Sequence, residues 1–326
     1  MISPLFITRV YFILSLCLFS ALTSAKPLHV IFDTDVGSDI DDLFALSLIL
    51  KSPELDLKLI TTVSGDTRYR AIVAAKFLQT AGRTDIPVAT GPAAEATAEF
   101  LRPWITGYDV TDYPGVINND AVDSMIALLK AADEPVTIIV AGPVSNVATV
   151  LKQAPELAAK MRVVGMQGSI YKGYRGGEPV AEYNVASDVE AFRTVLHGDV
   201  ASFAITPLDT CGEMIIDGKE YQQLKASHDT QVQALFDIYP IWADLVTWDK
   251  PDYLDEHSSI IYDAVAVYLA LPDHEWLPTE PVKLSVSDDG LTRPDETGTP
   301  VNAALRWENL PAFKTWFTQR MLTPAG

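Results

Sequence analysis

The amino-acid sequence predicts an α/β fold: a single-domain, doubly wound, mainly parallel sheet with helices on both faces. Three observations support this prediction. Short apolar runs alternate with segments of helical periodicity, several of these runs are almost continuously apolar, and no linker rich in Pro, Ser or Gly divides the chain. Continuously apolar strands are typical of parallel sheets, because crossover helices bury both faces. The 326 residues are enough for one large core, although this length would also allow two domains.

The amino terminus, residues 1–25, predicts a signal peptide, which leaves residues 26–326 as a single mature domain. Arg9 gives a positive start, residues 10–22 form an apolar stretch too short for a comfortable membrane span, and residues 23–25 are small, as expected before a cleavage site. An uncleaved anchor is the alternative. We therefore expect an exported protein, periplasmic or secreted, without membrane contact once the signal is removed.

The composition excludes several kinds of partner. Lys and Arg number 24 against 43 Asp and Glu, which gives a formal net charge of −19. A surface this acidic argues against binding to nucleic acid or to anionic membranes. Cys17 lies in the predicted signal peptide, so Cys211 is the single cysteine of the mature chain. No intrachain disulfide can form there, and stability must come from the packed core.

The alternation that defines the fold class is clearest in the first two thirds of the chain. Apolar runs predict strands at 28–32, 57–63, 86–90, 136–141, 161–166 and 201–205. Helical periodicity between them predicts helices at 43–50, 69–80, 121–132 and from Ser145 onwards. This order of elements favours parallel strands joined by crossover helices.

The last third of the chain is less regular. Gly and aromatic residues dominate 171–178, which we expect to be a mobile loop. Helical patterns cover 237–248, 263–270 and 310–322, and the alternation of apolar and polar residues at 282–286 predicts a late strand. This part of the chain should therefore add helices and one further strand to the fold.

The most informative segment is the turn between the first strand and the first helix. It carries five carboxylates in ten residues, at Asp33, Asp35, Asp39, Asp41 and Asp42. Helix capping accounts for one or two of them, but not for Asp33 and Asp35 at the strand end. Carboxylates this close repel one another, and burying them without a cation is costly. Because ligands made only of oxygen suit a hard cation, this acidic turn predicts a calcium or magnesium site.

The predicted topology places the acidic turn where a ligand would bind. In open parallel sheets, ligands bind beyond the carboxyl ends of the strands. Residues 64–66, 141–143 and 165–168 follow three other predicted strands, and each of these segments contains Gly. We therefore expect these loops and the acidic turn to converge on one cleft.

Together, these segments resemble the inosine–uridine-preferring nucleoside hydrolase family. The family opens with Asp-x-Asp-Pro-Gly-x-Asp-Asp after its first strand. Residues 33–37 and 41–42 are similar to the two halves of this motif, with Val36 in place of Pro and two extra residues in the turn. Further similar segments follow in the family's order, at 60–66, 141–146, 182–184 and 262–264. The resemblance spans residues 30–269, which is most of the mature chain.

The resemblance implies an enzyme that uses a metal-activated water to hydrolyse the N-glycosidic bond of ribonucleosides, releasing ribose and free base. It implies one Ca²⁺ at the bottom of the cleft, held by the carboxylates of Asp35, Asp42 and Asp263 and by the backbone carbonyl of Ala141. The metal would lower the pKa of the water, and Asp35 would take its proton. The alternative for Asp263 is a purely structural helix cap.

The resemblance also implies a set of side chains that bind the substrate. Asp41, Asn184 and Glu182 would hold the ribose hydroxyls, and Asp66, which stands where the family often has Asn, would assist. Two vicinal hydroxyls on the metal would select ribose over deoxyribose. Asp39 lies in the lengthened part of the acidic turn, where it either supports the site or is merely solvated; we expect the supporting role.

The leaving-group acid is the point where the sequence departs from the family. Many members have His before the last metal-binding Asp, where this chain has Tyr262, a poorer acid near neutral pH. His257 could substitute, or could be a solvated loop residue. Some aromatic side chains could stack on a base, although several could instead be core residues: Trp104, Tyr108, Tyr171, Tyr174, Tyr239 and Trp242. Base preference therefore stays open.

Two other functions are compatible with parts of the sequence. Residues 32–36 resemble the first motif of haloacid-dehalogenase-type phosphatases, in which Asp33 would be the nucleophile and magnesium the cofactor. Tyr262 in place of His also allows a calcium-dependent ribosyl- or nucleoside-binding protein without turnover. The nucleoside hydrolase resemblance explains more of the chain, and it also implies a small-molecule ribonucleoside substrate and a homo-oligomer.

Overall fold

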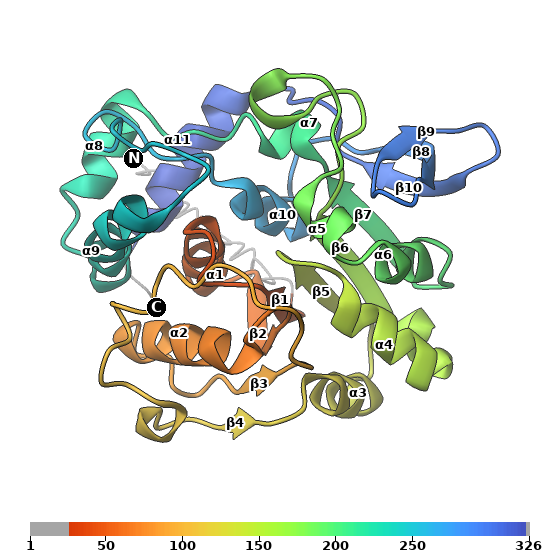
Figure 1. Cartoon of the computed structure of the whole chain (residues 1–326), viewed down its shortest axis with the longest axis horizontal. Helices are drawn as coiled ribbons and strands as arrows, with labels where there is room; N and C mark the ends of the chain where they lie inside the picture. Colours follow the sequence, from red (N-terminus) through yellow and green to blue (C-terminus); the bar gives the residue numbers. More distant parts are fainter. Residues whose placement is uncertain (1–25, 324–326) are drawn as a thin grey trace, which may run out of the picture.

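Strand β1 (Leu28–Thr34) lies in the middle of the sheet in the computed structural model, which describes residues 26–323 (Figure 1). It pairs in parallel with β2 on one side and with β5 on the other. Val30, Ile31 and Phe32 are fully buried, as expected of a strand covered on both faces. The predicted signal peptide lies outside the described residues and stays a prediction.

The sheet has ten strands in the order β4-β3-β2-β1-β5-β6-β7-β10-β8-β9. Neighbouring strands from β4 to β10 are parallel, and β8 and β9 are added in antiparallel orientation at one edge. The other strands are β2 (Leu55–Thr62), β3 (Val88–Thr90), β4 (Ile117–Asn118), β5 (Val136–Val140), β6 (Met161–Met166), β7 (Ser202–Thr206), β8 (Glu280–Val286), β9 (Thr292–Pro294) and β10 (Thr299–Ala303). A mainly parallel sheet, as predicted, is confirmed.

Helices cover both faces of the sheet, so the doubly wound prediction is also confirmed (Figure 1). One apolar cluster packs α1 (Asp41–Leu50), α2 (Thr67–Thr80), α8 (Gly218–Lys225), α9 (Thr230–Leu245), α10 (Tyr262–Ala270) and α11 (Leu310–Leu322) against the sheet. A second cluster packs α3 (Ala121–Ala131), α4 (Ser145–Gln153) and α6 (Val189–Leu196). Among residues 26–323, no helix is long and apolar enough to cross a membrane.

The topology fixes the position of the ligand site. Strand order runs in one direction from β1 through β2 to β4 and in the other from β1 through β5 to β7, so it reverses between β1 and β5. Ligands of doubly wound sheets bind at this reversal, beyond the carboxyl ends of the strands. The chain leaves β1 at Asp35 and β5 at Ala141, which places both residues at that point.

Most of the differences from the predicted elements lie in the second half. Helix α9 begins at Thr230 rather than 237, because Asp229 accepts hydrogen bonds from the Gln231 and Val232 amides and caps the helix there. The short helices α5 (Tyr183–Ser187) and α7 (Leu208–Cys211) were not predicted, and neither were α6 and α8. Strands β9 and β10 were missed as well, since each has few apolar residues.

Candidate active site at the carboxyl ends of β1 and β5

The acidic turn leaves β1 and enters α1 with most of its carboxylates buried. Asp33, Asp35, Asp41 and Asp42 are buried, and Asp39 is half-buried. The turn depends on Gly37, whose φ of 108° favours glycine and whose added Cβ would lie 2.7 Å from the Tyr69 ring. The Tyr69 hydroxyl donates to the Gly37 carbonyl at 3.0 Å, which fixes the far side of the turn.

Two carboxylates of the acidic turn lie close to a third from another helix. Asp41 and Asp42 lie in the first turn of α1 and Asp263 in the first turn of α10, and all three are buried. One oxygen from each lies within 4.8 Å of the others, which is close enough to hold one metal ion. The Thr34 hydroxyl donates to Asp42 and orients it. The structure thus joins Asp42 and Asp263, as predicted for metal ligands, with Asp41 rather than Asp35 as the third member.

The electrostatics of these carboxylates favour a cation. Burial raises the pKa of Asp41, Asp42 and Asp263 well above the usual range, and neighbouring carboxylates raise it further. Burial also raises the pKa of Asp35, while the Arg70 guanidinium opposes the shift. A hard cation with oxygen ligands would relieve the repulsion, so the donor set fits a metal of this kind.

Asp35 and Ala141 lie side by side at the reversal of strand order. A Cβ added to Gly142 would lie 3.1 Å from the Asp35 side chain, so the loop after β5 packs directly against Asp35. The Ala141 amide donates to the Asp33 carbonyl at 2.8 Å, and the Ala141 carbonyl accepts from Asn184 Nδ2 at 3.3 Å. These contacts confirm that the acidic turn and the predicted loop at 141–143 come together.

Glu182 and Asn184 connect α5 to the ends of β5 and β6. The Glu182 carboxylate accepts from the Gly168 amide at 2.8 Å and from the Asn184 amide at 2.7 Å. Burial raises the pKa of Glu182 to about 7, against the lowering effect of these bonds. Asn184 Nδ2 also donates to the Met166 carbonyl at 3.0 Å. The structure therefore shows Glu182 holding the backbone that carries Asn184, and ribose binding by both side chains stays a prediction.

Asp66 has a structural role in the described chain. Its carboxylate caps α2 by accepting from the Tyr69 amide at 3.0 Å, and it lies 3.1 Å from Arg102 Nη2. Its side chain is 43% exposed and lines a cavity of about 460 Å³ beside α2, together with Arg102 and Tyr108. No carboxylate of the acidic turn lines that cavity. The predicted assistance of Asp66 in ribose binding stays a prediction.

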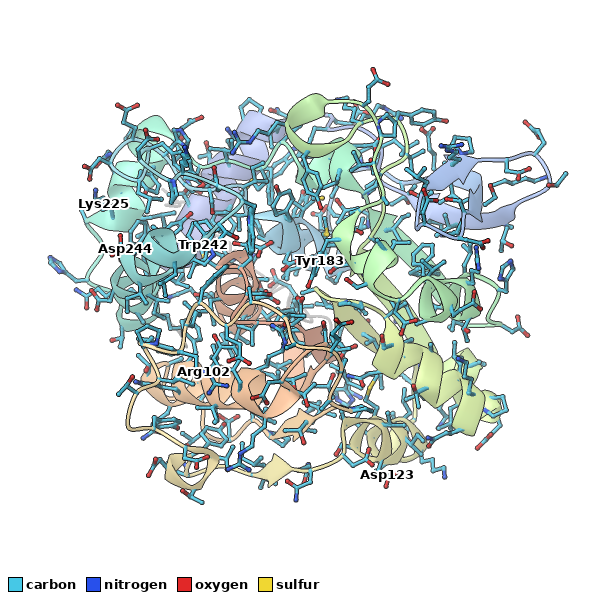
Figure 2. The ribbon with its side chains drawn as sticks, viewed as in Figure 1. Arg102, Asp123, Tyr183, Lys225, Trp242 and Asp244 are labelled. Carbon is cyan, nitrogen blue, oxygen red and sulfur yellow. The ribbon has the colours of Figure 1, made fainter. Side chains whose placement is uncertain are left out.

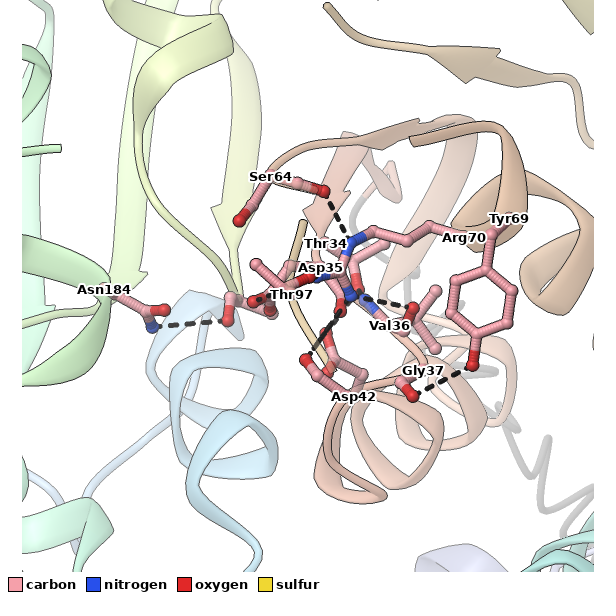
Figure 3. A network of polar contacts seen from close by, with 12 residues as sticks. Thr34, Asp35, Val36, Gly37, Asp42, Ser64, Tyr69, Arg70, Thr97 and Asn184 are labelled. Atoms are coloured by element: carbon pink, nitrogen blue, oxygen red, sulfur yellow. Dashed lines mark hydrogen bonds and ion pairs between the residues drawn. The ribbon is translucent and has the colours of Figure 1, made fainter. Parts of the chain in front are cut away.

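Arg70 is the residue of this region that sequence reasoning missed. It lies on α2, its side chain is 1% exposed, and its Nη2 is 3.9 Å from Asp35 Oδ2 (Figure 3). One signal could have found it: Arg70 shares its helical face with Val73, Ala74 and Phe77, all buried. A cation on an apolar helix face needs an anionic partner inside the protein.

A family model described as inosine-uridine preferring nucleoside hydrolase matches residues 30–315, which include the acidic turn and Asp263. The chain belongs to this nucleoside hydrolase family. The predicted N-glycosyl hydrolase class is thereby confirmed, and the phosphatase alternative, which rested on residues 32–36 alone, is set aside.

Relatives of this nucleoside hydrolase agree in sequence and in fold. The non-specific ribonucleoside hydrolase RihC of Salmonella paratyphi A is 33% identical over 228 residues, which are 65% of this chain and 72% of that protein. A plant nucleoside hydrolase, PpNRh1, superposes with a TM-score of 0.77 at 23% identity, over 92% of this chain and 100% of that one. A purine-preferring ribonucleoside hydrolase from Gardnerella vaginalis gives 0.74 at 22% identity, over 90% and 98%. The two structures support the fold alone.

Tyr262 and His257 have different surroundings in this nucleoside hydrolase. The pKa of Tyr262 is raised by burial and then by the Asp39 carboxylate, which makes the phenol a still weaker acid. Its ring meets that of Tyr174 edge-on at 6.2 Å. His257 stacks flat on Tyr253 at 4.4 Å, and its Nδ1 lies 2.7 Å from the Ser258 carbonyl. The leaving-group role predicted for both residues stays a prediction.

Several aromatic residues considered for base stacking lie elsewhere. Tyr239 and Trp242 are core residues of α9, and Figure 2 places Trp242 within that helical layer. Trp104 and Tyr108 lie over the Lys76 ammonium at 4.9 and 5.7 Å. Tyr183, which was not among the residues considered for base stacking, is 46% exposed at the start of α5, near the middle of the view in Figure 2. It is better placed than Tyr239 or Trp242 to meet a ligand.

Proposed function

We propose that this protein is a calcium-dependent hydrolase that releases ribose and free base from ribonucleosides. The observation that carries the proposal is the buried group of Asp41, Asp42 and Asp263 at the point where strand order reverses, with Asp35 beside it. These residues offer only oxygen atoms, which suits calcium better than metals that prefer nitrogen or sulfur. Bound calcium would supply charge that holds the two ribose hydroxyls and lowers the pKa of a water molecule.

The side chains of the site divide the reaction among themselves. Asp35 takes the proton of the attacking water, and the attacking oxygen forms a bond to the anomeric carbon while the bond to the base breaks. Asp41 and Asn184 hold the ribose hydroxyls. The Asn184 side chain donates to the Ala141 carbonyl at the end of β5, and Glu182 holds the backbone around Asn184. The base leaves with a proton supplied from the side of Tyr262 or His257.

Release of free ribose tests the proposal. The mature protein is incubated with inosine, uridine, cytidine and adenosine and with their 2′-deoxy counterparts, with calcium or with a chelator. We expect cleavage of ribonucleosides that stops with the chelator and is at least ~100-fold slower for the deoxy compounds, because one metal contact is lost. Calcium binding without release of ribose from any compound would instead indicate a binding protein. Cleavage at the same rate with and without chelator would show that the reaction does not need the metal.

A second prediction concerns pH and stability. Burial raises the pKa of Asp33 to about 7 and that of Asp39 to about 8, both from 3.8, and that of Glu182 to about 7 from 4.5. A raised carboxyl pKa means that the folded state binds more protons than the unfolded state, so stability falls as pH rises between the two values. We expect Tm in chelator to fall from about pH 5 to about pH 8, and calcium to reduce that fall. A Tm that rises over this window in chelator would contradict the prediction.

Export and assembly complete the proposal. The apolar stretch at residues 10–22 and the small residues before Lys26 support a cleaved signal peptide. Mass spectrometry of the protein secreted by its host would give the mature amino terminus, and a chain that begins at Met1 would exclude cleavage. We also propose a homo-oligomer, which light scattering of the purified protein would test.

A further inference from the structure

Arg70 is the cation of the acidic turn. Within residues 26–323, the single ion pair between the five carboxylates of the turn and a basic side chain joins Asp35 to Arg70. At 3.9 Å, the two groups attract each other without a direct hydrogen bond, so both Asp35 oxygen atoms stay free for a proton or a metal. The Arg70 side chain is buried on α2, so its charge lies inside the protein close to Asp35.

The guanidinium donates to segments on both sides of Asp35. Its Nε donates to the Ser64 carbonyl at 2.7 Å, and its Nη1 donates to the Val36 carbonyl at 3.1 Å (Figure 3). Ser64 has a φ of 68°, in the left-handed region, and this bond helps to hold that conformation. Arg70 therefore joins the end of β2 to the residue that follows Asp35.

A third segment is fixed through the same side chain. Arg70 Nη2 donates to Thr97 Oγ1 at 2.8 Å, in the loop that follows β3. This loop also contacts the acidic turn through the Phe100 amide, which donates to the Gly37 carbonyl at 3.0 Å. The Phe100 ring packs on Trp248 at 5.3 Å. One guanidinium thus holds three segments together: the acidic turn, the end of β2 and the loop after β3.

Only the shape of arginine satisfies all these contacts. A guanidinium is planar and presents five N–H donors in a fixed fork, whereas the lysine ammonium is a compact charge on a flexible stem. Lysine at this position would keep the charge near Asp35, but it could not span Ser64, Val36 and Thr97 at once. The effect of the positive charge can therefore be separated by experiment from the effect of the hydrogen bonds.

We propose that Arg70 is a positioning residue of the hydrolysis: by bracing Val36, Ser64 and Thr97 with its fork, it holds the Asp35 carboxylate in the orientation that accepts the proton of the attacking water. This proposal rests on the proposed function and adds to it a residue that lies outside the metal group. It predicts that kcat depends on the planar guanidinium group of Arg70, whereas KM does not.

The test compares Arg70→Lys, Arg70→Gln and Thr97→Val with the wild type and with Arg68→Lys, an exposed arginine on the same helix. The readouts are kcat and KM for the best ribonucleoside at saturating calcium, Tm and calcium affinity. We expect Arg70→Lys to lower kcat by about 10- to 100-fold with KM within about threefold, because small misplacements of a catalytic group cost this much. Arg70→Gln should lose at least as much, and Thr97→Val about threefold to tenfold.

Each alternative outcome contradicts the proposal in a different way. An Arg70→Lys enzyme with wild-type kcat would show that charge alone suffices. A different result would show that Arg70 is purely structural. In that case both Arg70 variants would have lower kcat, calcium affinity and Tm and a higher KM, while Thr97→Val would keep the wild-type kcat. A wild type that releases no ribose would contradict the proposed function itself, which separates that failure from failure of the role of Arg70.

Discussion

Replacing Asp35 with Asn is expected to lower kcat for ribonucleoside hydrolysis by ~10²- to 10⁴-fold, the usual contribution of a general base. Asparagine has nearly the same shape but cannot accept the proton. The contacts around the site should persist, because the loop after β5 packs on the Asp35 side chain and Arg70 is fixed by other partners. The measurement is ribose release at saturating calcium and saturating substrate.

Calcium binding and a matched variant complete this experiment. Asp41, Asp42 and Asp263 remain in Asp35→Asn, so we expect calcium to bind still, with lower affinity. Asp109→Asn removes an exposed carboxylate that pairs with Arg68 and should leave kcat unchanged. If Asp35→Asn turned over at the wild-type rate, Asp35 would not be the general base, and Asp41 would be the next candidate.

Replacing Asp263 with Asn is expected to have opposite effects on binding and on stability. Calcium affinity should fall at least ~10-fold, because α10 contributes only this carboxylate to the buried group. Stability of the metal-free protein should rise, because burial and four neighbouring carboxylates in the acidic turn raise the pKa of Asp263 and make its charge unfavourable. Calorimetric titration with calcium and Tm in chelator measure the two effects.

The control for this variant lies near the same helix. Asp273→Asn changes an exposed carboxylate just beyond the end of α10 and should alter neither calcium affinity nor Tm. If Asp263→Asn bound calcium as the wild type does, Asp263 would be a helix cap, and the metal would have to be held by the acidic turn alone. A lower Tm in chelator would contradict the electrostatic argument but not the metal site.

The sequence predicted the parts of the site that local patterns encode. Five carboxylates between a buried strand and a buried helix, residues 33–42, have few structural explanations, and the strand-end position of Asp35 followed from the fold class. The pairing of Asp42 with Asp263 came from the family resemblance, since nothing in the spacing of two such distant residues indicates that they meet. The structure joins them because α1 and α10 pack against each other in the same apolar cluster.

Long-range partners explain what the sequence did not predict. Arg70 belongs to a regular helical pattern, and its importance appears only when the ends of β1 and β2 and the loop with Thr97 come together. Asp66 has the motif position of a ribose-binding residue, yet the amide of Tyr69 and Arg102 engage its carboxylate in the described chain. The motif predicts contact with ribose. The observed contacts of Asp66 depend on Tyr69 and Arg102, which lie outside the motif.

The group of Asp41, Asp42 and Asp263 joins the first helix of the described chain, α1, to one of its last, α10. A metal held there would act as a reversible cross-link that closes a loop of more than two hundred residues. Within residues 26–323, Cys211 is the single cysteine, so no disulfide joins two parts of the described chain. Closing so long a loop restricts the unfolded chain, and a ligand that binds only the folded state adds its binding energy to stability. If calcium is this metal, as proposed, its concentration should therefore set how long the folded protein survives, as well as how fast it turns over.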